Sequence, residues 1–229
     1  MDYQANLAQV THRIRQAEQR FDRLQGSVQL LAVSKTKPIE AINALAKLGQ
    51  NAFGENYLQE SLDKIGQRPD LEWHFIGPIQ SNKTKPIAEH FNWVHSVDRL
   101  KIAQRLSAQR PTELPPLNIL LQVNISQEET KSGFSPQQLL DQVEQIQQLP
   151  NLTLRGLMAI PKAETEFDQQ RVALAQMHSL FNQLKSVLNT TNFDTLSMGM
   201  SGDLEAAIAE GSTLVRIGTD LFGARDYAV

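Results

Sequence analysis

Residues 28–50 read VQLLAVSKTKPIEAINALAKLGQ, in which a short β-favouring run passes directly into a helical one. The run VQLLAV at 28–33 is almost continuously apolar, which is typical of a strand buried on both faces of a parallel sheet. Pro38 then opens a segment whose apolar residues recur at helical spacing, and Gly49 suits the C-terminal cap of that helix. The stretch predicts one strand and one helix, joined by a short polar turn.

Seven further strand candidates follow the first one, and most of them lead into an amphipathic helix. They lie at residues 51–55, 73–77, 93–97, 118–124, 152–160, 195–199 and 214–219. Apolar strands separated by amphipathic helices predict a parallel sheet covered by helices. Eight such strands in 229 residues fit a single (β/α)8 barrel of the TIM type, preceded by an extra helix with an apolar stripe from Leu7 to Leu24. The same alternation permits an open doubly wound sheet, but we favour the barrel because no glycine fingerprint follows the first strand.

The composition excludes several classes of protein. The chain has 22 basic and 25 acidic residues in mixed order and a net charge of −3, so we predict that it binds neither nucleic acid nor a membrane. It has no cysteine, which excludes disulfides, thiolate metal sites and cysteine nucleophiles, and its five histidines show no metal-ligand spacing. No secretory signal, membrane-spanning run or interdomain linker is recognisable. We therefore expect one soluble, cytoplasmic domain over residues 1–229, without a bound metal.

Two glycine-bearing stretches at the ends of the last two strand candidates predict a phosphate site. SMGMSGD at 197–203 runs into a helix, whose first unpaired N–H groups attract anions. IGTD at 217–220 adds a glycine backbone and the hydroxyl of Thr219. Loops after the last two strands of a barrel commonly bind phosphate, although either loop alone is equally consistent with a tight turn. Asp203 and Glu205 add opposing negative charge, and we expect Asp203 to be the helix N-cap, with its carboxylate directed at backbone amides.

Lys35 and Arg216 are the other two residues whose type and position suggest chemistry. Lys35 follows the first strand at its C-terminal end, opposite the predicted phosphate site, where a lysine could form a Schiff base. Its neighbour Lys37 is interpreted as a solvated lysine. Arg216 interrupts an apolar strand and needs either an anion in the barrel mouth or a carboxylate on the helix-facing side. Phosphate, amine and guanidinium are the three contacts that pyridoxal 5′-phosphate (PLP) requires, whereas a phosphorylated sugar aldehyde would require only the first two.

A series of motifs along the chain resembles the signatures of the pyridoxal phosphate homeostasis protein family. They are LLAVSKTKP, FGENYLQE, WHFIGPIQSNK, ETKSGF, GLMAIP, LSMGMSGD and RIGTDLFG. The resemblance covers nearly the whole chain, from about residue 3 to Gly223. It implies a single-domain barrel of the alanine racemase N-terminal type that binds PLP, has no established catalytic activity and acts in vitamin B6 and amino-acid homeostasis.

The resemblance also assigns residues to the cofactor. Lys35 of AVSK matches the lysine that forms the aldimine, Arg216 matches an arginine near the ring nitrogen or the phosphate, and Asn56 of GENY matches a lining residue. Four residues match the phosphate cradle: Ser201, Gly202, Gly218 and Thr219. Two further lining candidates are His74 and Met158. Lys131 of TKSG matches a loop lysine that could accept the aldehyde, although a solvated loop lysine is the simpler interpretation.

The same features favour a carrier over a catalyst. An arginine beside the pyridine nitrogen disfavours its protonation, which makes the cofactor a weaker electron sink. Racemases of this barrel type use a second base from an additional β-domain, whereas this chain ends ten residues after Thr219. We therefore expect a monomer that buffers PLP or delivers it transiently to apo PLP enzymes, without robust catalysis. Two alternatives stay open: a small amino-acid racemase or lyase of fold type III, and a Schiff-base aldolase or phosphate-binding barrel.

Overall fold

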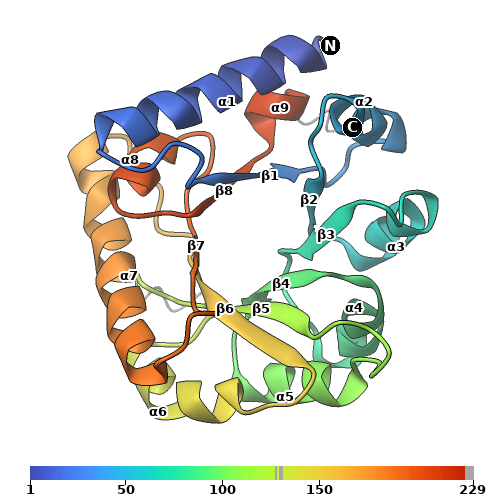
Figure 1. Cartoon of the computed structure of the whole chain (residues 1–229), viewed down its shortest axis with the longest axis vertical. Coiled ribbons are helices and arrows are strands. Elements are labelled where there is room, and N and C mark those ends of the chain that lie inside the picture. Colours follow the sequence, from blue (N-terminus) through green and yellow to red (C-terminus); the bar gives the residue numbers. More distant parts are fainter. Residues whose placement is uncertain (127, 129–130, 225–229) are drawn as a thin grey trace.

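Eight parallel strands form a closed barrel in the computed structural model, which describes residues 1–126, 128 and 131–224. The strands are β1 (Gln29–Val33), β2 (Ala52–Glu55), β3 (Glu72–Phe75), β4 (Trp93–Val97), β5 (Leu117–Gln122), β6 (Leu152–Met158), β7 (Thr195–Ser197) and β8 (Leu214–Ile217). Each strand pairs with the next along the chain, and β8 closes the barrel against β1, with Arg216 opposite Leu31. The prediction of a (β/α)8 barrel is confirmed (Figure 1).

Helices surround the barrel, as Figure 1 shows. They are α1 (Tyr3–Arg20), α2 (Ile39–Lys47), α3 (Leu58–Gln67), α4 (Thr84–His90), α5 (Leu100–Gln109), α6 (Pro136–Gln147), α7 (Phe167–Leu188), α8 (Leu204–Ala209), α9 (Thr219–Phe222) and the 3-10 turn η1 (Ser81–Lys83). α2 begins directly after Pro38, and Gly49 follows its end with a φ of +97°, a conformation that glycine adopts without strain. The sequence pattern therefore predicted both ends of this helix correctly.

The predicted strands agree with the observed ones to within two residues at either end, and most extend too far at the C-terminal end. The additional residues include Ile76, Val123 and Ile160. These apolar residues lie beyond the strands and line hollows at the mouth of the barrel, so their apolar character extends the strand-like pattern past the true strand ends. A second difference is α9. The pattern predicted strand up to Thr219, whereas the chain turns into this short helix directly after Gly218.

The extra N-terminal helix is confirmed and lies on the outside of the barrel, but it ends at Arg20, so Leu24 of the predicted apolar stripe lies beyond it and is 83% exposed. α1 buries Val10, Ile14 and Ala17 on one face and packs against α2, α8 and α9. In Figure 1 it runs along one edge of the molecule, across α8 and α9. Because α8 follows β7 and α9 follows β8, the helix contacts the two segments that the sequence analysis singled out for phosphate binding.

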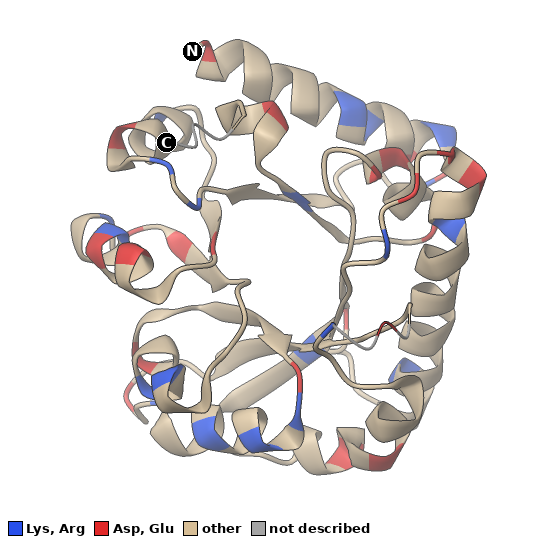
Figure 2. Cartoon of the chain, turned by 180° about the vertical axis from the view of Figure 1, so that it is seen from behind, with Lys and Arg blue, Asp and Glu red and all other residues tan. Residues whose placement is uncertain are grey.

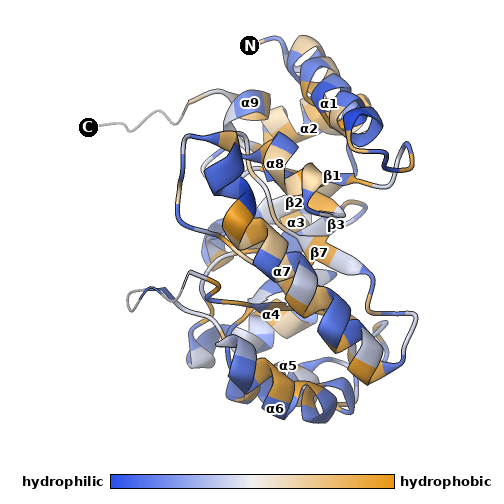
Figure 3. Ribbon diagram, turned by 90° about the vertical axis from the view of Figure 1, so that its left-hand side faces the viewer, coloured by the Kyte–Doolittle hydropathy of each residue, from blue (hydrophilic) through white to orange (hydrophobic). Residues whose placement is uncertain are grey.

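The main apolar core lies between the sheet and the helices. Trp73 and Phe75 are buried in it, and so are the apolar residues of α7, including Leu174 and Leu184. Figure 3 shows hydrophobic and hydrophilic residues side by side along α7, as expected of a helix with one covered face. Figure 2 shows the charged residues gathered mainly on helices and loops. None of the described helices is both long and apolar enough to cross a membrane.

Alternation along the strands directs several polar side chains into the barrel interior. Because Trp73 and Phe75 face the helices, His74 between them faces the interior. The same alternation turns Ser197 and Arg216 inward, and all three polar residues are buried. The interior of the barrel is therefore partly polar, and this polar part begins directly below the strand ends that carry the candidate site.

Candidate functional site

A cavity of about 320 Å³ lies at the C-terminal ends of the strands, which is within the range of small-molecule sites. Seven of the residues that the sequence assigns to the cofactor line it: Lys35, Asn56, Ser201, Gly202, Arg216, Gly218 and Thr219. Its other lining residues are Val33, Lys37, Ile76, Ile160, Met200 and Gly223. The structure therefore brings together, from β1, β2, β7 and β8, the groups that the sequence analysis treated as one site.

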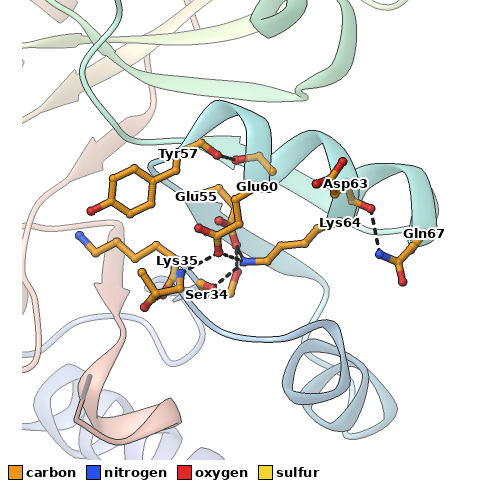
Figure 4. Close-up of polar contacts among 10 residues, drawn as sticks. Ser34, Lys35, Glu55, Tyr57, Glu60, Asp63, Lys64 and Gln67 are labelled. Carbon is orange, nitrogen blue, oxygen red and sulfur yellow. Dashed lines mark hydrogen bonds and ion pairs between the residues drawn. The ribbon is translucent and has the colours of Figure 1, made fainter. Parts of the chain in front are cut away.

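The backbone on both sides of Lys35 is held by a buried cluster of charged and polar groups (Figure 4). Ser34 Oγ donates to Glu55 Oε1 at 2.5 Å. Lys64 Nζ donates to the same Oε1 at 2.8 Å, to the carbonyl oxygen of Ser34 at 2.9 Å and to Glu60 Oε1 at 2.5 Å. The side chain of Lys35 points away from this cluster in Figure 4. The cluster thus anchors the backbone that carries the lysine, while the lysine itself extends to the cavity.

Thr36, on the other side of the lysine, has an unusual backbone conformation. Its φ is +63°, which is costly for a β-branched residue and is found mainly where the surroundings impose it. Its amide donates to Glu60 Oε1 at 2.7 Å, so the same carboxylate that meets Lys64 also holds this turn. The strained turn fixes the direction in which Lys35 leaves the strand.

Glu55 is a fully buried carboxylate within the cluster. Burial raises the pKa of this carboxyl, while the Lys64 ammonium and the Ser34 hydroxyl act in the opposite direction. Its Oε2 accepts no hydrogen bond from the described residues. The ion pair with Lys64 therefore compensates only part of the cost of burying this group.

The loops after β7 and β8 meet the cavity through Ser201, Gly202, Gly218 and Thr219. Asp203 is the N-cap residue of α8, as predicted, but its carboxylate accepts from the amide of Met200 at 2.6 Å and not from an amide of the helix. The carboxylate of Asp203 therefore stabilises the turn of its own loop, from Met200 to Asp203.

Arg13 of α1 joins these two loops, and the sequence analysis did not find it. Its Nε and Nη2 pair with both oxygens of Glu205 at 2.9 and 3.0 Å, and its Nη1 pairs with Asp220 at 2.6 Å. Its Nη2 also donates to the carbonyl oxygen of Ser201 at 3.1 Å. Burial alone would raise the pKa of Glu205, but Arg13 outweighs it and the pKa is lowered. Of the two carboxylates that opposed anion binding in the sequence, Glu205 is therefore neutralised by a residue 192 positions away, whereas Asp203 is held by the amide of Met200.

Arg216 faces the barrel interior and not the surrounding helices. It is 4% exposed, and Nη1 donates to both Ser197 O and Ser197 Oγ at 2.8 Å, while Nη2 donates to Ala159 O at 3.0 Å. Burial lowers its pKa to about 10, so the guanidinium keeps its charge at neutral pH. The alternative of a helix-facing arginine paired with a carboxylate is therefore wrong.

Two lining candidates from the sequence lie outside the cavity. His74 is 1% exposed and bonded within the barrel interior, and Met158 packs there with Trp93 and Leu120. Both side chains point into the barrel interior below the mouth. The sequence does not distinguish this position from one that lines the cavity.

The two additional lysines differ from each other. Lys131 pairs with Glu128 at 2.7 Å and lines an adjoining hollow that shares Asn56 with the cavity. Lys37 is not simply solvated, because it lines the cavity and donates to the carbonyl oxygen of Ala224 at 3.1 Å.

The cavity offers several groups that a ligand could use. They are the amines of Lys35 and Lys37, the guanidinium of Arg216, the two glycine-bearing loops and the side chain of Asn56. The Asn56 Oδ1 atom is buried and accepts no hydrogen bond from the described residues, which points to a donor supplied by a ligand or by water. No group of three or more potential metal ligands occurs in the part of the chain that the structure describes.

Comparison with known proteins identifies close relatives. The family model described as "Alanine racemase, N-terminal domain" matches residues 5–226. A pyridoxal phosphate homeostasis protein from Pseudomonas aeruginosa is 60% identical over 224 residues, which cover 97% of this chain and 95% of the relative. The protein of the same name from Pasteurella multocida is 55% identical over 232 residues and is covered completely.

A solved structure is also similar. PipY of Synechococcus elongatus PCC7942, in a structure with PLP bound, superimposes with a TM-score of 0.80 at 37% identity, covering 91% of this chain and 98% of PipY. The family model covers all eight strands, so the site can be interpreted at the level of the family.

Proposed function

The chain belongs to the alanine racemase N-terminal domain family, and we propose that it binds PLP in the cavity at the barrel mouth and buffers or delivers it. The observation that carries the proposal is the convergence of an amine, a buried guanidinium and two glycine-bearing loops on one cavity. The PLP bound by PipY, a relative of 37% identity, and the names of the curated relatives support the same ligand.

The residues of the cavity fit the chemical groups of PLP. The backbone amides and hydroxyls of Ser201, Gly202, Gly218 and Thr219 suit the phosphate. Arg13 favours its charge there by neutralising the carboxylates of Glu205 and Asp220. The amine of Lys35 would condense with the aldehyde and release water, forming a reversible imine. The unsatisfied oxygen of Asn56 suits a donor on the ligand.

The lining of the cavity favours holding the cofactor over catalysis with it. Arg216 remains charged at neutral pH, and a positive charge near a pyridine nitrogen opposes its protonation, which weakens the ring as an electron sink. Among the described lining residues, only Lys35 and Lys37 could remove a proton from a bound amino acid, and no carboxylate, histidine or tyrosine is present. The naming of the relatives as homeostasis proteins agrees with this interpretation.

The first experiment tests the bond to Lys35. After incubation with PLP, the purified protein should show the absorbance band of an imine, and borohydride should fix the cofactor on Lys35, as detected by peptide mass spectrometry. Lys35→Ala should lose both signals, whereas Lys47→Ala, at the exposed end of α2, should keep them. A wild-type protein that shows neither signal would contradict PLP binding.

A second experiment separates the carrier from the racemase or lyase alternative. Loaded protein mixed with an apo PLP enzyme should reactivate that enzyme even when a scavenger removes free PLP from solution. The same preparation should catalyse no exchange of the Cα proton of amino acids with deuterated solvent above the rate of free PLP. Exchange that depends on Lys35 would instead establish an enzyme. We further propose that residues 1–229 act as one monomeric domain, which light scattering of the loaded protein tests.

A further inference from the structure

A continuous chain of hydrogen-bonded side chains crosses the interior of the barrel. Arg216 Nη1 donates to Ser197 Oγ at 2.8 Å, and that oxygen lies 3.0 Å from His95 Nδ1. His95 Nε2 lies 2.9 Å from His74 Nδ1, and His74 Nε2 lies 2.8 Å from Glu72 Oε1. Arg216 lines the cavity, whereas Glu72 begins β3 and its side chain is 41% exposed. This hydrogen-bonded chain of side chains therefore connects the cavity with the opposite end of the barrel.

The two ends of this chain determine where each proton lies. A guanidinium offers only donors and a carboxylate only acceptors, so Glu72 requires a proton on His74 Nε2. A neutral imidazole carries one N–H, which leaves His74 Nδ1 to accept the proton on His95 Nε2. His95 Nδ1 then accepts from the hydroxyl of Ser197, and Ser197 Oγ accepts from Arg216. Every donor meets an acceptor in this order.

The surroundings keep both imidazoles neutral, as this order requires. Burial lowers the pKa of His74, against the opposing effect of Glu72. Burial also lowers the pKa of His95 well below its usual value, and repulsion from His74 and Arg216 adds to the effect. The ring of His74 stacks on Trp93 with centroids 5.3 Å apart and an interplanar angle of 4°, which fixes the plane of its hydrogen bonds.

We propose that Glu72, His74 and His95 are positioning residues for Arg216, and that Glu72 sets the direction of the chain. In this arrangement Ser197 Oγ is held as an acceptor for the guanidinium. Together with the carbonyl oxygens of Ser197 and Ala159 it engages three of the five N–H donors of Arg216. The remaining donors are presented to the cavity that Arg216 lines.

The competing arrangement runs in the opposite direction. A protonated His74 would donate from both of its nitrogens, and His95 would donate from Nδ1 to Ser197. Ser197 Oγ would then receive two donors, and its own proton would need a different acceptor. The two arrangements differ in the protonation of both imidazoles, which makes them distinguishable by experiment.

The first test observes the protons directly in the full-length protein. In a sample labelled with 15N-histidine at neutral pH, long-range proton–nitrogen correlation spectra distinguish the Nε2–H form, the Nδ1–H form and imidazolium. We expect the Nε2–H form at both positions. The signals of the two histidines are assigned by the loss of one signal in His74→Phe and of the other in His95→Phe. An Nδ1–H form or imidazolium at either position would overturn the proposal.

The second test reverses the chain from its far end. Glu72→Lys places a donor where the acceptor was, on a partly exposed side chain, so His74 and His95 should both change to the Nδ1–H form. Glu113→Lys makes the same change of charge on an exposed loop and should leave both imidazoles unchanged. Thermal unfolding shows whether each variant is folded. Unchanged tautomers in a folded Glu72→Lys protein would refute the directing role of Glu72.

A third test measures the affinity of the cavity for PLP, and it rests on the proposed function. The dissociation constant of PLP should rise roughly tenfold in Glu72→Lys and stay unchanged in Glu113→Lys, since a hydrogen bond to a charged group contributes about this much. Switched tautomers with unchanged affinity would refute the positioning of Arg216. A wild-type protein that binds no PLP would contradict the proposed function, while the tautomer experiments would still decide the order of protons.

Discussion

Arg13 Nη2 in the N-terminal helix donates a hydrogen bond of 3.1 Å to the carbonyl oxygen of Ser201, which lies 188 positions further along the chain. The same guanidinium pairs with Glu205 and Asp220, which belong to the segments after β7 and β8. Both segments contribute lining residues to the cavity. The extra helix is therefore a structural part of the site, although none of its residues lines the cavity.

Replacing Arg13 should weaken phosphate binding. In Arg13→Met the carboxylates of Glu205 and Asp220 lose their counter-charge next to the proposed phosphate loops, and the carbonyl of Ser201 loses a donor. We expect the dissociation constant of PLP, measured by absorbance titration, to rise about ten- to a hundredfold.

A matched control for this prediction is Arg171→Met, which removes a similar ion pair with Glu210 at the far end of α8. Its affinity should match that of the wild type. Equal affinities in the Arg13 and Arg171 variants would show that the contacts of Arg13 with the segments after β7 and β8 do not contribute to PLP binding.

Replacing Lys64 should destabilise the protein strongly. Lys64→Met leaves Glu55 buried without its counter-ion, at a cost of about 3–5 kcal/mol in the free energy of unfolding. Urea denaturation measures this loss. The double variant with Glu55→Gln should recover part of it, because no unpaired charge then remains buried. If the double variant is no more stable than Lys64→Met, the charge on Glu55 is not the source of the loss.

The stability of the link between α1 and β1 should depend on pH through Glu18. This carboxylate is 1% exposed, pairs with Arg15 and accepts from the amides of Gly26 and Val28 at 3.0 and 2.8 Å. Burial alone would raise the pKa of Glu18, but these partners outweigh it and the pKa is lowered. Its contribution is thus fully present above the ordinary glutamate pKa and is lost as the pH falls through the lowered value.

Glu18→Gln should accordingly reduce the free energy of unfolding at pH 7 by about 1–3 kcal/mol. The difference from the wild type should shrink as the pH falls below the ordinary glutamate pKa and through the lowered pKa of Glu18, where the wild-type carboxyl also becomes protonated. Denaturation curves at a series of pH values measure it. If the difference in the free energy of unfolding between Glu18→Gln and the wild type is the same at all pH values, the loss comes from the changed shape of the side chain and not from its lost charge.

Two glycines should respond to alanine in opposite directions. Gly156 in β6 has a φ of +151°, and an added Cβ would collide with the carbonyl oxygen of Thr195 in the neighbouring strand, so Gly156→Ala should cost about 3 kcal/mol or more. Gly66 lies in α3, and apart from the backbone of its own helix no heavy atom lies within 4 Å of an added Cβ, so Gly66→Ala should stabilise by about 0.5–1 kcal/mol. Thermal unfolding compares the two, and a tolerated Gly156→Ala would contradict the close approach of β6 and β7.

The sequence by itself determined the order of strands and helices and the end of the strands at which the cavity lies, and it favoured a barrel that the structure shows to be closed. Apolar runs such as that from Val28 to Val33 alternate with amphipathic helices, and this local pattern requires no knowledge of distant contacts. Because the C-terminal ends of all parallel strands meet at one mouth, Lys35, Arg216 and Thr219 could be assigned to one site from their places on strands. Strand ends were less accurate, since the residues at the mouth are apolar as well.

Only the tertiary structure decided what surrounds that cavity. Arg13, Lys64 and His95 act through partners far away in the chain or on another element, and a helical or strand pattern says nothing about which charge an exposed-looking side chain will meet. The sequence also leaves the depth of a residue in the barrel open, so His74 is a lining candidate there although it lies in the interior below the cavity. Local pattern depends on the periodicity of burial, whereas the pairing of polar groups depends on how the closed barrel brings its strands and helices together.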